Sequence, residues 1–171
     1  MIPKGGGTDF RGIGLVEVTW MAISGIINHR IYSSIQFHNA LHIFFVGRGT
    51  ETATLKEKLL QQLIAMRETV LHSIFLNLRN SYKALDRDRC MYILVGYRVG
   101  PRTLRILRTY WFRIHIAEKA GGHYKPVFQS QRGVTQGEPL SPKIFNVVVD
   151  AIIWHWVKVV GGTQEGTRQG T

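Results

Sequence analysis

The sequence predicts a mixed α+β fold. Three observations support this: leucines at helical spacing in residues 54–67, apolar and polar residues that alternate in 70–78, and a long apolar stretch in 142–160. A helix, a strand and further helices in this order are typical of α+β proteins. Apolar residues make up 44% of the 171 residues and charged residues 19%. This composition can form a core and excludes disordered and collagen-like chains.

The first predicted helix covers residues 54–67. Its apolar residues recur every three or four positions, as in an amphipathic helix: Leu55, Leu59, Leu60, Leu63 and Ile64. Thr54 and Glu57 have the spacing of a capping box, in which side chains and the first backbone N–H groups bond reciprocally. We therefore expect the helix to begin at Thr54.

A strand is predicted over residues 70–78. Ile74, Leu76 and Leu78 alternate with polar or aromatic residues at the two-residue period of a β-strand. Asn77 would then lie near the carboxyl end of this strand.

A second helix is expected to begin at Pro101, because proline suits the first helical turn and Gly100 precedes it. Its apolar side consists of Leu104, Leu107, Tyr110, Trp111 and Ile114. Its other side carries Arg102, Arg105, Arg108 and Arg113, and no acidic residue lies between Arg98 and Arg113. These arginines could bind phosphates, and a merely solvated helix surface is an equally good interpretation.

A third helix is predicted from an N-cap at Ser141 and a proline at position 142, and it extends to Val160. The helix is apolar on nearly all sides, so we expect protein to cover most of it. Trp154 and Trp156 in this helix, like Trp111, are therefore interpreted as core residues rather than as platforms for nucleic-acid bases.

The chain is strongly basic. It has 22 Lys and Arg against 11 Asp and Glu, a net charge of +11, and a pI near 10.2. Residues 91–171 hold 11 of the basic and 4 of the acidic residues, and so account for +7 of this charge. A polyanion such as a nucleic acid is the partner that this distribution favours.

Other features indicate where the chain acts. The single cysteine, Cys90, excludes an intrachain disulfide and favours a reducing, intracellular compartment. We expect no membrane partner, since no stretch has the length and apolarity of a membrane-spanning helix or of a secretory signal. The glycine-rich residues 161–171 are expected to form a flexible tail.

One motif is far more specific than the others, and it reads Gln131-Arg132-Gly133-Val134-Thr135-Gln136-Gly137-Glu138-Pro139-Leu140-Ser141-Pro142-Lys143-Ile144-Phe145-Asn146. It resembles the fourth core motif of reverse transcriptases of the non-LTR retrotransposon and group II intron type. The resemblance implies RNA-directed DNA synthesis, a nucleotidyltransferase reaction, on an RNA or DNA template-primer. Gln136 would hydrogen-bond the incoming nucleotide, and Gly133 and Gly137 would let the backbone approach the nucleic acid.

Three earlier stretches resemble the same family in order and spacing. Ile2-Pro3-Lys4 and Phe10-Arg11-Gly12-Ile13 are similar to the fingers segment, where Lys4 and Arg11 would hold the triphosphate. Residues 36–50, which end in Gly47-Arg48-Gly49-Thr50, are similar to the next fingers motif, and Arg48 would face the nucleic acid. Residues 74–83 resemble the palm motif in which Tyr82 would lie under the nucleotide sugar.

The fold that the resemblance implies is the fingers and part of the palm of a right-hand polymerase. Residues 1–69 would form a fingers-like segment. Residues 70–160 would form a partial palm, with a fingers-like hairpin insertion near 115–132.

The sequence departs from the family where the Mg²⁺ ions are held. Asn77 stands where the family has a catalytic Asp, and Lys83 replaces a second Asp. Two Mg²⁺ ions about 4 Å apart repel each other by roughly 15–20 kcal/mol at an effective dielectric of about 20, and carboxylates must offset that repulsion. Glu138 occupies a position that is not a metal ligand in the family. The family's aromatic-Ala-Asp-Asp motif does not occur before Thr171, so we expect an incomplete palm, no productive Mg²⁺ site and no catalysis by this chain alone.

Three interpretations stay open. The first is a degenerate reverse-transcriptase fragment, a pseudoenzyme that at most binds nucleic acid. The second is a relic without activity that self-associates through the exposed edge of the palm strand at 70–78. The third is a polymerase that is active only when a further C-terminal part completes it. His38 and His42 have the spacing of a metal pair, but no third ligand lies near them in the sequence.

Overall fold

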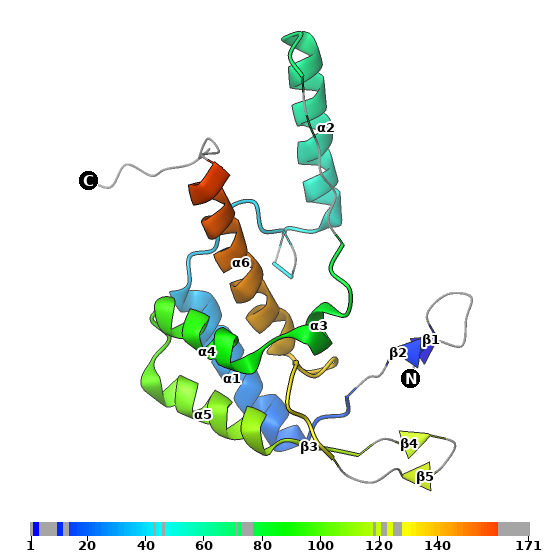
Figure 1. Ribbon diagram of the computed structural model, residues 1–171, viewed down its shortest axis with the longest axis vertical. Helices are drawn as coiled ribbons and strands as arrows, with labels where there is room; N and C mark the ends of the chain where they lie inside the picture. The colour runs from blue at the N-terminus through cyan, green and yellow to red at the C-terminus, as the bar shows by residue number, and fades with distance from the viewer. Residues whose placement is uncertain are drawn as a thin grey trace. The chain divides into compact units, whose positions relative to one another are not determined.

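The computed structural model describes residues 2–3, 10–11, 14–42, 44–45, 47–70, 72, 77–117, 119–120, 123–124 and 128–160 (Figure 1). The chain forms two compact units that alternate along the sequence. The first contains Met1–Gln36 and Asn80–Val148, and the second contains Phe37–Arg79 and Val149–Thr171. Neither unit ends at the expected boundary between residues 69 and 70, and the assignment to fingers and palm stays a prediction.

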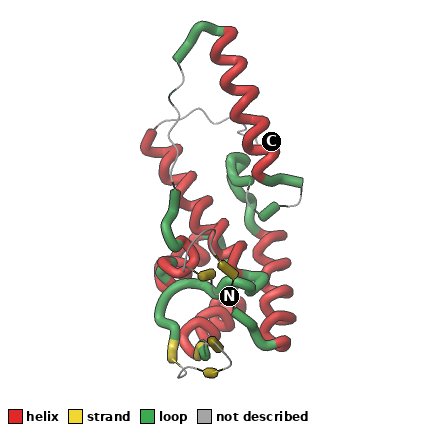
Figure 2. The backbone as a smooth tube through the Cα atoms, turned by 90° about the vertical axis from the view of Figure 1, so that its right-hand side faces the viewer, coloured by secondary structure: helices red, strands yellow, loops and turns green. Residues whose placement is uncertain are grey.

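The first unit is mostly helical. It contains α1 (Val18–Ser34), α3 (Ser81–Ala84), α4 (Arg87–Gly96), α5 (Pro101–Arg113) and the beginning of α6 (Ser141–Val160). Figure 2 shows the helices of the chain in red. Four residues of α1 are buried at spacings of three and four: Trp20, Ser24, Ile27 and Ile31. Helix α1 was not predicted from the sequence, because exposed apolar residues on its other sides obscure the helical period.

Helix α5 confirms the predicted helix at Pro101, with proline in the first turn and Gly100 as N-cap. Leu107 and Trp111 are 0% and 2% exposed, so the apolar side of α5 lies in the core. The arginines on the other side of α5 are exposed, as predicted. Leu94 of α4 and Leu140 complete this part of the core, each 1% exposed.

Helix α6 extends to Val160 as predicted, but only its first half is buried as expected. It begins at Ser141 itself, and the Ser141 hydroxyl donates to the Glu138 carboxylate instead of capping the helix. Ile144 and Val147 are buried, whereas Trp154 and Trp156 are exposed. The prediction of cover on most sides, and of a core position for these two tryptophans, is therefore wrong, although it is confirmed for Trp111. The apolar pattern continues to Val160, but among the described residues the buried positions of α6 end at Asp150.

The described strands are short antiparallel pairs. β1 (Ile2–Pro3) pairs with β2 (Phe10–Arg11), β3 (His115–Ile116) with β6 (Phe128–Gln129), and β4 (Lys119–Ala120) with β5 (His123–Tyr124). In β3 and β6, His115 lies opposite Gln129. The pair β4–β5 lies between β3 and β6 in the sequence. The predicted hairpin insertion near 115–132 falls partly outside the described residues, and its role in the fingers stays a prediction.

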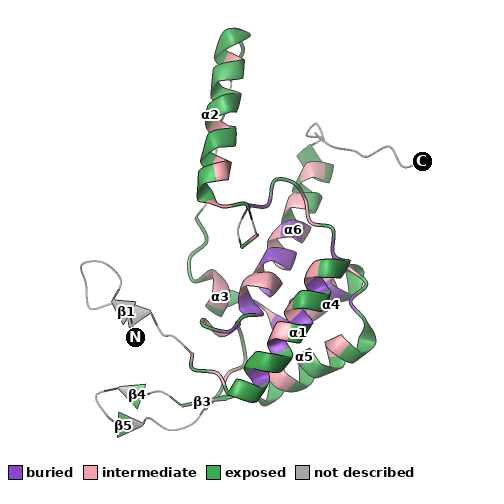
Figure 3. Cartoon of the chain, turned by 180° about the vertical axis from the view of Figure 1, so that it is seen from behind, coloured by how far each residue is buried: buried purple, intermediate pink, exposed green. Residues whose placement is uncertain are grey.

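The second unit contains α2 (Thr50–Met66) and the end of α6. The predicted helix exists, but it begins four residues before Thr54. Gly49 is its N-cap, and the Thr52 hydroxyl accepts from Gly49 N at 2.9 Å. The predicted capping box at Thr54 is wrong, because the Thr54 hydroxyl lies inside the helix and donates to Thr50 O. No residue of α2 is buried, as Figure 3 shows.

The predicted strand over residues 70–78 is not found at its described positions. Val70, His72, Asn77 and Leu78 lie outside helices and strands, and the rest of the segment lies outside the described residues. Alternation specifies a strand only where a second strand pairs with it. The strands that the structure describes pair with one another elsewhere. The exposed palm edge expected here therefore has no support at these positions.

Candidate nucleic-acid interface

The loop that opens the specific motif is held against the protein's own backbone. Gly133 N donates to Leu85 O at 2.8 Å, and Val134 N donates to Tyr82 O at 2.9 Å. Gly133 is buried and has a φ of +77°. A Cβ atom at Gly133 would lie 2.7 Å from Tyr82 O and 2.8 Å from Lys83 Cα. Glycine is therefore required here for a left-handed conformation and for close packing on α3.

Tyr82 lies directly beside this loop. Its half-buried ring stacks on the ring of Phe145, with centroids 5.2 Å apart and planes 16° apart. Burial raises the pKa of the Tyr82 phenol, which stays neutral at physiological pH. Lys83, the next residue of α3, is exposed. The structure thus packs Gly133 against the backbone at Tyr82. That the two belong to a nucleotide site stays a prediction.

Gln136 is fixed through its main chain. Gly14 N donates to Gln136 O at 2.7 Å, and a Cβ atom at Gly14 would lie 2.1 Å from the Thr135 methyl carbon. The Gln136 side chain is partly exposed, and the exposed Gly137 has a φ of +107°. The backbone around the predicted nucleotide contact is therefore defined, and the glutamine side chain is accessible.

Arg87, the first residue of α4, holds the same loop from its other side. The side chain is 5% exposed. Its Nε donates to Gly133 O at 2.9 Å, its Nη2 to the Ser130 hydroxyl at 2.9 Å and to Arg132 O at 3.4 Å. Its Nη1 donates to Trp111 O and to Ser130 O. Burial lowers the pKa of this guanidinium, and the side chain stays charged at physiological pH because an arginine titrates far above it.

A role for Arg87 was not predicted from the sequence. The only signal was its position, since a cation at the N-terminus of a helix opposes the helix dipole and needs another reason to be there. The structure supplies that reason: the guanidinium binds Trp111 O, one of the last carbonyls of α5, where a cation is favourable.

Glu138 is a buried carboxylate that is used inside the protein. It is 3% exposed and accepts from Trp20 Nε1 and, at 3.2 Å, from the Ser141 hydroxyl. Burial raises the pKa of Glu138, and the bonds from Trp20 and Ser141 oppose that shift. Trp20 also stacks on Tyr110, with ring centroids 3.6 Å apart. Both carboxylate oxygens thus have partners within the first unit.

The exposed side of α5 carries the basic surface of the first unit. We call Arg102, Arg105 and Arg108 the α5 arginine row. The three side chains are exposed and recur every third residue, and α5 contains no acidic residue. The Arg108 guanidinium carbon lies 5.9 Å from the ring centroid of the exposed Phe112. Such an arrangement can bind phosphate oxygens through guanidinium groups that no carboxylate on the same helix neutralises.

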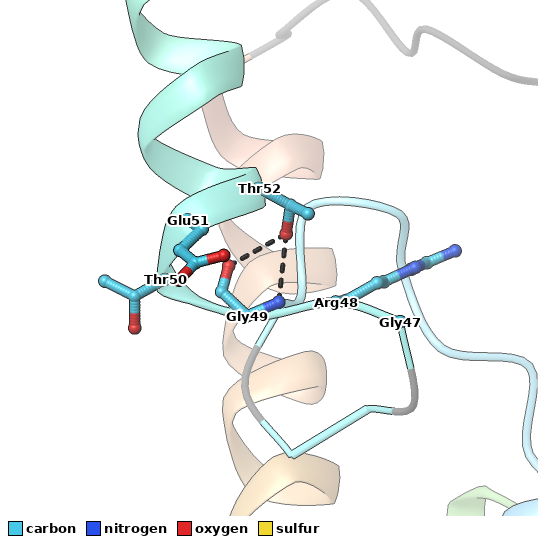
Figure 4. A pocket seen from close by; sticks show the side chains of 6 residues that line it. All are labelled: Gly47, Arg48, Gly49, Thr50, Glu51 and Thr52. Carbon is cyan, nitrogen blue, oxygen red and sulfur yellow. Dashed lines mark hydrogen bonds between the residues drawn. The ribbon is translucent and has the colours of Figure 1, made fainter.

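Arg48 belongs to a different place, at the start of α2. It lines an open hollow of about 490 Å³ together with Gly47, Gly49, Thr50, Glu51 and Thr52 (Figure 4). His42 Nδ1 lies 3.1 Å from the Thr52 hydroxyl beside it. Burial, followed by the charges of Lys56 and Arg48, lowers the pKa of His42. The lining of the hollow holds one cation, Arg48, and one anion, Glu51. That Arg48 faces nucleic acid stays a prediction.

The structure gives less support for the remaining predicted site residues. Asn77 is exposed and lies in a stretch without helix or strand. Lys4 and the side chain of Arg11 lie outside the described residues. His38 packs edge-on against Trp154, while His42 contacts Thr52, so the two histidines have separate partners. Among the described residues, no group of three or more His, Cys, Asp or Glu side chains could hold a metal ion, and no helix is long and apolar enough to span a membrane.

Comparison with known proteins relates the chain to a retrotransposon protein. No protein-family model matches the sequence. The chain is 27% identical over 165 residues to the "Retrovirus-related Pol polyprotein from type-1 retrotransposable element R2" of Nasonia vitripennis. The alignment covers 90% of this chain and 15% of that polyprotein, so the chain spans less than a sixth of its relative. This similarity relates the chain to retrotransposon proteins.

Proposed function

We propose that this chain is a reverse-transcriptase-like domain that binds RNA or DNA and has no polymerase activity of its own. Its fold would be the fingers and part of the palm of a right-hand polymerase. Similarity to a retrotransposon Pol polyprotein supports the proposal, as does the motif at 131–146, whose loop packs beside Tyr82.

The α5 arginine row is the observation that carries nucleic-acid binding. The apolar side of α5 is buried in the first unit, so the helix is fixed and its three arginines are held on the exposed side. Fixed guanidinium groups without a neighbouring carboxylate gain more from phosphate contacts than flexible, neutralised ones. The basic excess after residue 90 extends this positive surface potential.

The absence of catalysis is proposed from the residues at the palm motif. Asn77 offers a neutral amide where the family has a carboxylate, and the exposed Lys83 adds a cation close to Tyr82 in sequence. A neutral oxygen and an ammonium group do not offset the charge of two Mg²⁺ ions. The described residues therefore do not fit the Mg²⁺ pair of the family.

Binding is tested by salt titration with a labelled single-stranded RNA. The unaltered chain should lose affinity steeply with salt. The triple variant Arg102→Gln, Arg105→Gln, Arg108→Gln should reduce the slope of log K against log salt by about 2, since each single-strand phosphate contact contributes roughly 0.7. The control triple Arg30→Gln, Lys56→Gln, Lys58→Gln changes the net charge equally at exposed positions. Equal losses in the two triples, or no binding at all, would refute a role for the row.

Catalysis is tested by primer extension on an RNA template with Mg²⁺ and nucleotides. We expect no incorporation above a control without protein. Measurable extension by the unaltered chain would overturn the proposal of a pseudoenzyme.

Self-association is the competing outcome, and α2 is the feature that favours it. Its leucines are 45–58% exposed: Leu55, Leu59, Leu60 and Leu63. Exposed apolar stripes of this kind promote association between copies. Light scattering at tens of micromolar protein distinguishes nucleic-acid binding from self-association. A monomer that binds RNA supports the nucleic-acid function. Oligomers that bind no RNA support the interpretation as a relic.

A further inference from the structure

The loop at residues 130–137 depends on one buried cation. A guanidinium group has five N–H donors, and the structure gives Arg87 five acceptors from two segments: Trp111 O in the last turn of α5, and Ser130 O, Ser130 Oγ, Arg132 O and Gly133 O in the loop. Every acceptor is a neutral oxygen. The group is therefore saturated by hydrogen bonds to neutral oxygens, and the charge of Glu138 also favours its charged form.

Two backbone hydrogen bonds hold the same loop from its other side. Gly133 N and Val134 N donate to Leu85 O and Tyr82 O, which lie just before Arg87 in the chain. The loop is thus held on one side by these two backbone bonds and on the other by the guanidinium group. Gly133 can pack this closely on the backbone of Tyr82 and Lys83 only because it lacks a Cβ atom.

We infer that Arg87 is a positioning residue: it fixes the loop 130–137 on the junction of α3 and α4, where Gly133 and Val134 contact the backbone at Tyr82, and so determines where the following residues Gln136 and Gly137 are presented. The relevance to nucleotide recognition rests on the proposed function, whereas the fixing of the loop does not. The guanidinium shape is essential, because a lysine ammonium has three donors on a single nitrogen and cannot bind all five acceptors. Loss of the side chain would leave buried carbonyl oxygens without donors.

The test is amide hydrogen exchange of the whole chain without nucleic acid. In Arg87→Ala and in Arg87→Lys, exchange in residues 130–137 should accelerate by about tenfold or more, whereas α1 and residues 141–148 should exchange as before. Methylguanidinium should restore slow exchange in Arg87→Ala. Arg89→Ala is the matched control, because it removes an exposed arginine from the same helix and should leave the loop unchanged.

A gentler variant keeps the inference testable if Arg87→Ala does not fold. Ser130→Ala removes one acceptor and should accelerate exchange in the same segment by a few-fold. Unchanged exchange in residues 130–137 of Arg87→Lys and Ser130→Ala would overturn the inference, as would equal acceleration throughout residues 80–148. If the α5 triple variant loses RNA binding but Arg87→Lys retains it, the proposed function is supported independently of the role inferred for Arg87.

Discussion

Helix α5 in the first unit and helix α2 in the second both have an apolar side opposite a polar one. In α5 the apolar side is buried, with Leu107 fully covered, and the arginines opposite it are held on the surface. In α2 no residue is buried, and five large apolar side chains along it are exposed: Leu55, Leu59, Leu60, Leu63 and Met66.

The difference shows that apolar periodicity predicts a helix but does not predict the surface on which its apolar side packs. α5 contacts α4 closely, and the Arg87 guanidinium binds the carbonyl of Trp111 near the end of α5. α2 has local support: Thr52 at its start, and an i, i+4 bond from Gln61 to Glu57 at 3.4 Å. A helix with only such support contributes little stability of its own in water.

The largest contrast is expected from leucine truncation. Leu107→Ala should lower the free energy of unfolding by about 2–5 kcal/mol, because it opens a cavity in a packed core. Leu59→Ala on the exposed side of α2 should change it by about 0.5 kcal/mol or less. Urea denaturation followed by circular dichroism measures both. Equal losses would show that α2 is packed in solution and would break the comparison.

A glycine pair tests the two units in the same way. Gly47 and Gly133 have φ values of +74° and +77°, but a Cβ atom at Gly47 meets nothing within 4 Å. Gly47→Ala should cost about 1–2 kcal/mol for its left-handed conformation. Gly133→Ala should cost about 1–3 kcal/mol more, because the new methyl group overlaps the backbone of Tyr82 and Lys83. Thermal melting of the two variants measures the difference, and equal costs would contradict the close packing at Gly133.

The first unit should lose stability as pH rises. Burial raises the pKa of Glu138 above its usual 4.5, so the folded state binds this proton more tightly than the unfolded state does. The stabilisation is complete below about pH 4.5 and is lost as pH rises through the raised pKa. Melting temperatures measured from pH 4.5 to 8 should therefore fall less in Glu138→Gln than in the unaltered chain. The exposed Glu17→Gln serves as the control, and an identical slope in Glu138→Gln would refute the assignment.

The second unit should show the opposite pH dependence. Burial and the nearby cations lower the pKa of His42 below its usual 6.5, so the unfolded state binds this proton more tightly. The contribution of His42 is complete above about pH 6.5 and is lost as pH falls through the lowered pKa. An NMR titration of the His42 ring measures this directly. A midpoint at or above 6.5 would contradict the burial of His42 beside Thr52.

The helices were the most predictable part of the fold. Pro101 and the opposed apolar and arginine residues predicted α5 correctly, because that helix is amphipathic and its partner is in the same unit. The start of α2 was misplaced, since Thr54 and Glu57 match a capping box by spacing, whereas Gly49 and Thr52 form the actual start. The strand at 70–78 was predicted from alternation alone, and alternation contains no information about a pairing partner.

The sequence motif predicted residues of the candidate site but not the contacts that hold them in place. The sequence indicated Tyr82, Gly133 and Gln136, and the structure shows that Gly133 packs on the backbone at Tyr82. Arg87 could not be found, because its five acceptors include four backbone carbonyl oxygens, which every residue type has. Contacts of a buried side chain with main-chain atoms leave no pattern in a single sequence.

The four tryptophans divide evenly between the two units, and this gives the chain two optical reporters. Trp20 and Trp111 are buried in the first unit, and Trp154 and Trp156 are exposed on the part of α6 that belongs to the second. Acrylamide should quench the emission of the second pair strongly and that of the first pair weakly. Replacing one pair with phenylalanine would make emission from the other pair follow the unfolding of a single unit.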